Sequence, residues 1–306
     1  MTMLLTDADV AAGLDAPTAV AAMRAALLAA HHGRLVAPPR ATTPLDGGRL
    51  VFTAGRLGDE WYGYRSYDTF GRTGSEQLVV LHEAETGRIR AIAVGSEIGS
   101  RRTGAIGGVA VDALARPEAA TLAVIGAGGQ AWTQVWAAAS VRRLREVRVY
   151  CRTAARGELF AARVRAELDV PARVATGAAA AVRDADVVVL ATTSATPVIG
   201  AADLAPGAHV NAVGFKQQGR AEFGTDLLDR AEVLVTDAPE QVGGYDPPML
   251  AAVPPHRDRL VPLGAVLAGA APARTRPEQV SLFCSLGLAG TEVFLLDRLA
   301  RATVRT

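Results

Sequence analysis

Short apolar runs alternate with helix-like stretches through the middle of the chain. The runs lie at 121–125, 146–150, 172–175, 187–191, 209–213 and 232–236. Each run is of strand length, and the stretches between most of them are long enough to form a helix. This alternation is typical of βαβ units, whose parallel sheet is covered by helices on both faces. The sequence therefore predicts an α/β fold with a doubly wound parallel sheet.

A glycine-rich turn follows the first run and opens the first helix-like stretch, in the order Val-Ile-Gly-Ala-Gly-Gly-Gln-Ala. Gly126 allows the tight turn, Gly128 lets the backbone approach a pyrophosphate, and Ala131 lets the helix pack closely on the sheet. The helix N-terminus then binds the phosphates. The motif predicts a Rossmann-type dinucleotide site. Its expected contacts are Gly126, Gly128, Gly129, Gln130 and Ala131.

The end of the second run bears on the choice of dinucleotide. An acidic residue there would hydrogen-bond the adenosine ribose of NAD(H). The chain has Tyr150-Cys151-Arg152-Thr153 instead, and Arg156 follows three residues later. Two guanidinium groups and no carboxylate suit a 2′-phosphate. We predict NADP(H), bound by Arg152, Thr153 and Arg156, with NAD(H) as the alternative if these arginines only solvate a helix start.

The rest of the chain predicts a second domain of a different kind. A length of 306 residues, half of them hydrophobic, is enough for two cores. Before residue 117 we expect an α+β arrangement, and we expect a loop at 243–259. The tail at 280–300 is predicted to be one apolar-faced helix that packs on the first domain. The expected extended segments are 50–53, 62–67, 78–82 and 89–94, after a helix at 17–31.

Composition and charge exclude several classes of partner. The formal net charge is +1, and the charges are scattered, so no long-range field would attract nucleic acid or a membrane surface. The sequence shows neither a long uncharged apolar run nor a signal-like N-terminus, so we expect a cytoplasmic protein. Cys151, Cys284 and the five histidines show no disulfide or metal-ligand spacing. A small-molecule ligand is the favoured partner, and no metal is expected.

Several motifs together resemble a known family. They are Arg40 after a proline-rich stretch, Glu-Thr-Gly at 85–87, Ser-Arg-Arg-Thr-Gly-Ala at 100–105, the glycine turn, Asn-Ala-Val-Gly at 211–214, Glu222, and Ser-Leu-Gly at 285–287. This set resembles the ornithine cyclodeaminase and mu-crystallin family, which includes ketimine reductases and amino acid dehydrogenases. The resemblance covers nearly the whole chain. It implies a Rossmann domain at 117–277, inserted in an α+β substrate-binding and dimerisation domain at 1–116 plus 278–306, and a homodimer.

The resemblance also suggests which residues bind the substrate and cofactor. Arg40 and Arg102 match family positions that hold the substrate carboxylate, and a guanidinium can bind a carboxylate with two hydrogen bonds. Arg65 is expected beside them, and strand alternation should turn either Tyr67 or Asp68 toward the same pocket. Asp68 is included as a substrate residue. Further expected cofactor contacts are Thr103, Thr192, Thr193, Ser194, Val213 and Phe215.

Two positions depart from the family pattern. Arg65 stands where the family usually has a lysine, and an arginine cannot act as a general acid. Lys216 stands where cyclodeaminases have an aspartate that assists loss of the amine. The base is lost there, and a second cation would repel the ammonium of ornithine. The chain is therefore expected to belong to the reductase or dehydrogenase branch, without ornithine cyclisation.

Lys216 is the single lysine among 32 basic residues. It follows a predicted strand at the edge where ligands bind in parallel sheets. We expect Lys216 to supply the proton, and Lys216 and Arg65 to be the catalytic pair. The predicted activity is NAD(P)H-dependent reduction of an imino or keto acid, reversible as an amino acid dehydrogenation, with a second substrate carboxylate favoured by the number of cations. The alternatives are a redox-neutral lyase using bound NAD+ and a non-catalytic NADPH-binding protein.

Overall fold

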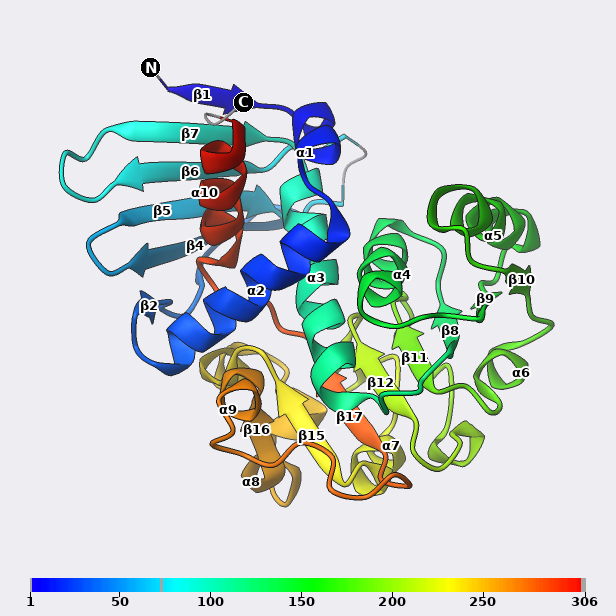
Figure 1. Cartoon of the computed structure of the whole chain (residues 1–306). Coiled ribbons are helices and arrows are strands. Elements are labelled where there is room, and N and C mark those ends of the chain that lie inside the picture. Colours follow the sequence, from blue (N-terminus) through cyan, green and yellow to red (C-terminus); the bar gives the residue numbers. More distant parts are fainter. Residues whose placement is uncertain (1, 72–73, 304–306) are drawn as a thin grey trace. The chain divides into compact units, whose positions relative to one another are not determined.

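The computed structural model describes residues 2–71 and 74–303, and the chain forms two compact units (Figure 1). The first unit is Met1–Arg102 with Gly287–Thr306, and the second is Thr103–Leu286. The sequence placed these divisions at 116/117 and 277/278. They differ because the later part of helix α3 (Glu97–Leu114) packs within the second unit, and because strand β17 (Ser281–Cys284) belongs to that unit's sheet.

The first unit contains a mostly antiparallel sheet. Its strand order is β1-β7-β6-β5-β4-β2, with β3 paired to β4, and β1 is parallel to β7. The four extended segments expected here are confirmed within β4, β5, β6 and β7. The bounds are β1 (Met3–Leu5), β2 (Leu35–Val36), β3 (Ala41–Leu45), β4 (Gly48–Leu57), β5 (Trp61–Asp68), β6 (Leu78–Glu83) and β7 (Ile89–Val94).

Three helices complete the first unit: α1 (Asp7–Gly13), α2 (Ala16–His31) and α10 (Thr291–Thr303). Asp15 begins α2 by accepting a hydrogen bond from the Thr18 N–H at 2.8 Å. Helix α10 lies across one face of the sheet (Figure 1), where Phe294 packs edge-on against Trp61. Packing of α10 here confirms the expected contact of the tail with the first domain.

The prediction of one helix at 280–300 is wrong. Residues Ser281–Cys284 form strand β17, and the helix begins only at Thr291. Between them Gly287 and Gly290 have positive φ angles of 80° and 76°, which interrupt any helix. The apolar pattern was misleading because a strand buried on both faces is apolar at every position, as an interior helix segment can be.

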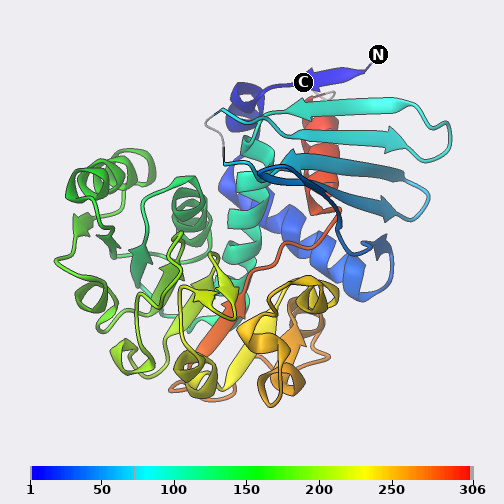
Figure 2. The same ribbon diagram turned by 180° about the vertical axis from the view of Figure 1, so that it is seen from behind.

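The two faces of the first sheet differ. Along β5, Trp61, Gly63 and Arg65 are buried, whereas Tyr62 and Tyr64 on the opposite face are 38% and 37% exposed. In Figure 2 no helix of the described residues covers that second face. Exposed aromatic side chains on an uncovered sheet are typical of an interaction surface.

Within the described residues, no single helix is long and apolar enough to span a membrane. The bent pair α1 and α2 meets that criterion together, by length and composition only.

The second unit contains an eight-stranded sheet in the order β10-β9-β8-β11-β12-β17-β15-β16, all parallel. Helices lie on both of its faces (Figures 1 and 2), as predicted. All six predicted runs are strands. The strand bounds are β8 (Thr121–Ile125), β9 (Glu146–Tyr150), β10 (Ala172–Val174), β11 (Val187–Leu190), β12 (His209–Ala212), β15 (Val233–Thr236) and β16 (Leu260–Pro262).

The connections of the second unit include a short hairpin and, after α3, five α-helices besides the one-turn helix α8. The helices are α4 (Gly129–Val141), α5 (Ala154–Leu168), α6 (Ala178–Val182), α7 (Thr225–Arg230) and α9 (Leu263–Leu267), and the hairpin strands are β13 (Lys216–Gln217) and β14 (Arg220–Ala221). The expected loop at 243–259 contains a 3₁₀ turn at Leu250–Ala252 and the one-turn helix α8 (His256–Arg259). Glycines bring α3 close to α4, since a Cβ on Gly107 would collide with the Gln134 side chain.

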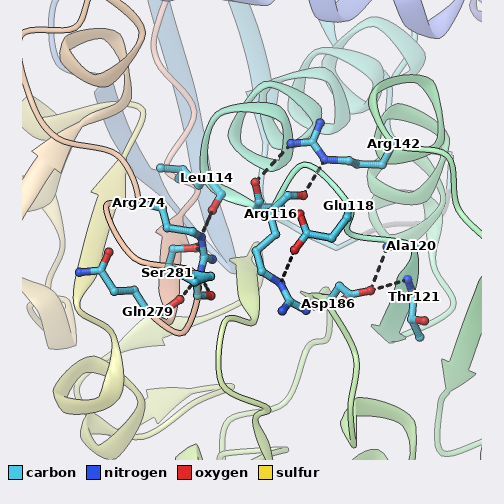
Figure 3. Close-up of polar contacts among 12 residues, drawn as sticks. Leu114, Arg116, Glu118, Ala120, Thr121, Arg142, Asp186, Arg274, Gln279 and Ser281 are labelled. Carbon is cyan, nitrogen blue, oxygen red and sulfur yellow. Dashed lines mark hydrogen bonds and ion pairs between the residues drawn. The ribbon is translucent and has the colours of Figure 1, made fainter.

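Arginines satisfy the last carbonyl groups of α3, at the edge of the sheet where the strands begin (Figure 3). Arg142 donates to the carbonyl of Asp112 in the helix and to that of Arg116 just beyond it, and Arg274 donates to that of Leu114. Asp186 accepts the backbone N–H groups of Ala120 and Thr121, each at 2.9 Å, as well as the Arg116 guanidinium. A helix end that would otherwise leave carbonyls unpaired is thus held by positive charge.

A buried hydrogen-bond chain starts from the same place. The Arg274 guanidinium donates to Ser281 Oγ, which lies 2.9 Å from His209 Nδ1, and His209 Nε2 lies 2.8 Å from Asn211 Oδ1. The Asn211 amide donates to Gln134 Oε1, so its own oxygen must be an acceptor. His209 Nε2 therefore carries a proton and donates it to Asn211 Oδ1. Burial, followed by the charges of Arg274 and Arg142, lowers the pKa of His209 to about 3.

This buried histidine predicts loss of stability in mild acid. Because its folded pKa lies below the ordinary 6.5, the unfolded chain binds the proton first, and stability falls as the pH drops from 6.5 toward 3. We expect the His209 contribution to the free energy of unfolding to decrease by about 2 to 3 kcal/mol between pH 7 and pH 4.5. Urea unfolding of the wild type and of His209→Gln checks this. The variant should lose that part of the pH dependence, whereas substitution of the exposed His31 by Gln should keep it.

Candidate functional site

The strand order of the second unit reverses at β8, whose neighbours are β9 on one side and β11 on the other. At the carboxyl ends of these strands lies a cavity of about 270 Å³. Ligands of parallel α/β sheets bind at such a reversal point. The structure brings together here many of the residues expected to bind the cofactor. They are Gly126, Gly128, Arg152, Thr153, Arg156, Thr192, Thr193 and Ser194.

Gly126 and Gly128 of the turn are glycine for different structural reasons. Gly126 has a φ of 117°, and an added Cβ would collide with the Ala191 carbonyl. Gly128 precedes α4 in extended conformation, and an added Cβ there would meet nothing within 4 Å. The first glycine is required by the fold, but the second leaves open space beside the helix N-terminus. That space fits the approach of a pyrophosphate group.

Arg152 and Arg156 lie at the β9 side of the cavity and are exposed. Neither guanidinium group forms a hydrogen bond or ion pair with another residue in the part of the chain that the structure describes. The Cys151 thiol donates to the Thr153 carbonyl at 3.0 Å and so fixes the turn that carries them. Two uncommitted guanidinium groups beside a nucleotide cavity suit a phosphate group.

A buried carboxylate, Glu222, joins the two loops at the carboxyl ends of β11 and β12. It accepts hydrogen bonds from the Thr192 N–H at 2.9 Å, the Thr192 hydroxyl at 3.0 Å and the Gly214 N–H at 2.6 Å. Burial raises the pKa of Glu222, against the lowering effect of these bonds and of the Lys216 charge. Sequence reasoning included Glu222 in the family pattern but gave it no role. Nothing in a linear sequence shows that its side chain turns back toward residues 30 positions earlier.

Lys216 lies beyond the carboxyl end of β12, as expected, and is only 5% exposed. Its ammonium donates to the carbonyls of Val213 at 3.2 Å and Gly214 at 2.6 Å. The guanidinium of Arg220 lies over the neighbouring Phe215 ring, with Arg220 Cζ 3.5 Å from the centre of that ring. The other predicted cofactor residues do not line the cavity, and their cofactor contacts stay predictions: Thr103, Gly129, Gln130, Ala131, Val213 and Phe215.

The first unit brings two of the predicted arginines onto one buried carboxylate. Glu292 at the start of α10 accepts hydrogen bonds from Arg65 at 2.5 Å and from Arg102. Burial raises the pKa of Glu292, but the charges of Arg102 and Arg65 outweigh it and lower that pKa to about 2. Glu292 is therefore ionised throughout the neutral range. It was missed from the sequence because its position in an apolar tail suggested only packing.

Arg65 is held from several sides. Its Nε donates to Gln77 Oε1 at 3.0 Å, and its Cζ lies 4.2 Å from the centre of the Tyr67 ring. Tyr67 is thus the residue that faces Arg65, as strand alternation allowed. Asp68 instead accepts hydrogen bonds from the Phe70 N–H at 3.0 Å and the Ser75 hydroxyl at 2.6 Å. Its role in substrate binding stays a prediction.

Arg40 and Arg102 converge near Gly287. Arg40 Nη2 donates to the Gly287 carbonyl at 3.1 Å. A Cβ added to Gly287 would lie closer than 3.0 Å to Arg102 Nη1 and to Arg40 Nη2. Arg102 is 5% exposed, and its buried Nε has no hydrogen-bond partner among the described residues. Two guanidinium groups beside one small residue suit the binding of an anion.

Within residues 2–71 and 74–303, no three His, Cys, Asp or Glu side chains are grouped so that they could hold a metal ion.

The nucleotide cavity of one unit and the buried arginines of the other are typical of dinucleotide-dependent oxidoreductases that act on small acids. The chain belongs to the ornithine cyclodeaminase/mu-crystallin family, whose family model matches residues 1–300.

Individual relatives agree with this assignment. A Delta(1)-pyrroline-2-carboxylate reductase from Bacillus cereus is 31% identical over 76% of this chain and 73% of its own. An L-lysine cyclodeaminase from Streptomyces rapamycinicus is 34% identical over 77% of this chain and 68% of its own. The solved structure of the Thermococcus litoralis Delta(1)-pyrroline-2-carboxylate reductase, in complex with NADH and L-proline, has a TM-score of 0.92 at 25% identity and covers 99% of this chain and 98% of that one.

The open space at Gly128 predicts a binding defect without a folding defect. In Gly128→Ala the new methyl group should occupy the space left for the pyrophosphate, so the Kd for NADPH should rise at least tenfold while Tm stays within about 2 °C. Fluorescence titration and thermal unfolding measure the two effects. Gly177→Ala is a matched control, because Gly177 also precedes a helix in extended conformation with nothing near an added Cβ. Equal weakening in both variants would contradict the assignment.

Proposed function

We propose that this protein is an NAD(P)H-dependent reductase that converts an imino acid to the corresponding amino acid. The observation that carries the proposal is the convergence of Arg40 and Arg102 on Gly287, which suits a carboxylate, in a chain of this family. The reductase relatives named above support the reaction type. The activity is oxidoreduction at a carbon–nitrogen bond, and with the oxidised cofactor and the amino acid it runs in reverse.

The first unit's residues bind and orient the acid. Arg40 and Arg102 hold the carboxylate, and a planar guanidinium fixes its orientation as well as its position. Glu292 fixes Arg102 and Arg65 by accepting a hydrogen bond from each. Arg65 therefore adds positive charge and helps to fix the position of Glu292. It takes no part in proton transfer, because arginine stays protonated.

The second unit's residues hold the dinucleotide and provide the proton. The loop at 126–128 receives the pyrophosphate, and the residues after β9 and β11 receive the adenosine part. The bound cofactor supplies a hydride to the imine carbon. Lys216 supplies the proton that the nitrogen needs, or keeps it in place on the amine product, since a lysine ammonium can transfer a proton where an arginine cannot.

The proposal predicts NAD(P)H consumption with imino acids. Purified protein is given preformed cyclic imines and mixtures of amines with 2-keto acids, and oxidation is followed at 340 nm. We expect turnover of at least one substrate that carries a carboxylate beside the imine, and no turnover of the same imine lacking that carboxylate. Substrates with a second carboxylate are compared with those bearing a neutral side chain. A faster reaction of the neutral ones would remove the expected preference for dicarboxylic acids.

The same assay separates the alternative functions. A lyase of the cyclodeaminase type, which the L-lysine cyclodeaminase relative keeps open, would release ammonia with no net change in NADPH. A protein that only binds the cofactor would show NADPH fluorescence changes without turnover or ammonia release. Either result would overturn the reductase.

We propose further that the cofactor is NADP(H). Support comes from two exposed arginines after β9, Arg152 and Arg156, whose guanidinium groups line the cavity. Neither group is paired with a carboxylate of the described residues. A 2′-phosphate would pair with both, and NADH offers only a hydroxyl there.

Replacing both arginines should reverse the cofactor preference. In the double variant Arg152→Ala, Arg156→Ala, we expect the Kd for NADPH to rise at least tenfold, because a charge-assisted contact to phosphate contributes about 1.5 to 3 kcal/mol. The Kd for NADH should change less than about threefold. Arg165→Ala is the control, since that arginine on α5 donates to the Ala172 carbonyl and does not line the cavity. Equal losses for both dinucleotides would favour NAD(H) as the natural cofactor.

We also propose that the protein is a homodimer formed through the uncovered face of the first sheet. Phe52, Tyr62 and Tyr64 are exposed there, and the Tyr62 ring stacks on His82 at 4.7 Å. A second copy of the same face has the matching shape and composition, because a twofold interface pairs a surface with itself.

A charge at this face should separate the subunits. We expect Tyr64→Asp to shift the molar mass in light scattering from that of a dimer toward that of a monomer, since two unpaired carboxylates would be buried at the interface. Leu159→Asp is the control, because Leu159 is 73% exposed on α5 of the other unit. A wild-type protein that is monomeric at micromolar concentration would contradict the proposal.

A further inference from the structure

Glu222 and Lys216 are buried side chains of opposite charge in the second unit, and both contact Gly214. Glu222 is 0% exposed and Lys216 is 5% exposed. An isolated carboxylate in such a place would be strongly destabilising, so it needs both hydrogen bonds and a counter-charge. The Lys216 ammonium supplies that charge, and its electrostatic effect on Glu222 is favourable for ionisation.

The pair is also connected through the backbone. Gly214 donates its N–H to Glu222 at 2.6 Å, and its carbonyl accepts the Lys216 ammonium at 2.6 Å. One peptide residue thus lies between the two charges and contacts both. Gly214 has no room for a side chain, because an added Cβ would collide with the Glu222 carboxylate and the Thr192 carbonyl.

Glu222 reaches the cofactor cavity through its other oxygen. Thr192 donates both its N–H and its hydroxyl to Glu222 Oε2, and Thr192 lines the cavity. The Thr192 hydroxyl in turn accepts the Ser194 N–H at 3.1 Å, so the carboxylate fixes the loop after β11. The same group therefore contacts the loop that borders the cofactor and the loop that carries Lys216.

Two further titratable groups, Cys284 and Asp237, lie in this part of the described chain, and the charges of Lys216, Asp237 and Glu222 all act on the Cys284 thiol. The thiol of Cys284 on β17 is fully buried, and burial raises its pKa to about 12, so it stays protonated. Asp237 after β15 accepts the Leu286 N–H at 2.7 Å. Glu222 is the carboxylate in this part of the described chain that bonds both loops.

We propose that Glu222 is a positioning residue of the reductase that holds Lys216 in its charged form. It also fixes the loop after β11, which borders the cofactor cavity, and the loop after β12, which carries Lys216, and in this way couples cofactor binding to proton transfer. This inference rests on the proposed function for its catalytic part. Its cofactor part is independent of turnover, because it depends on the bond between Glu222 and Thr192.

The test compares Glu222→Gln with the wild type on an imine that the wild type reduces. Without the carboxylate the Lys216 ammonium is less stable, so the alkaline limb of the kcat/KM profile should move to lower pH by about one unit. We expect kcat at neutral pH to fall at least tenfold, with a smaller change in KM. The exposed Glu240 provides the control variant Glu240→Gln, whose profile should match the wild type. Glu222→Asp keeps the charge and should retain the position of the limb if Glu222→Gln folds poorly.

A double-mutant comparison separates this role from a structural one. Lys216→Met alone should lower kcat at least a hundredfold. If Glu222 acts through Lys216, adding Glu222→Gln to Lys216→Met should lower kcat less than threefold further. A tenfold loss in both backgrounds, or an unmoved alkaline limb in Glu222→Gln, would overturn the proposal.

Cofactor binding gives a readout that does not need turnover. Glu222→Gln should raise the Kd for NADPH at least fivefold in fluorescence titration, and Glu240→Gln should leave it unchanged. If the wild type reduces no imine, the proposed function fails while this measurement still decides the loop-fixing part. An unchanged Kd in Glu222→Gln would overturn that part as well.

Discussion

Buried carboxylates bonded by groups from distant parts of the chain are the interaction on which the rest of the structure depends. In the first unit Glu292 holds Arg65 and Arg102, and in the second unit Glu222 holds Thr192 and Gly214. Each carboxylate would be costly to bury alone, so its partners cannot move away without a large penalty. The functional side chains are therefore fixed before any ligand binds.

Small residues make these contacts geometrically possible. A Cβ on Gly63 would collide with Val293, and a Cβ on Gly55 would collide with the backbone of Gly290. The segment before α10 can thus lie directly on the sheet, which brings Glu292 within reach of Arg65. In the second unit Gly214 has the same relation to Glu222. Glycine here serves close packing of charged groups as well as backbone conformation.

Buried and half-buried arginines make structural contacts in both units. Arg142 and Arg274 satisfy the carbonyls at the end of α3, and Arg40 and Arg102 converge on Gly287. Since an arginine keeps its charge when it is buried, such groups suit permanent binding and structural tasks. Lys216, the single lysine, lies where we propose that a proton is transferred, and this division of tasks follows from the chemistry of the two side chains.

The sequence by itself determined the parallel sheet, the glycine turn and the position of Lys216 beyond β12, because strand periodicity and turn chemistry are local properties. It failed at 280–300, where a fully buried strand and a helix have the same apolar pattern, and only pairing with β12 and β15 decided between them. It also gave no role to Glu222 and Glu292. Their importance arises from burial and from partners distant in the sequence, and those are set by tertiary packing alone.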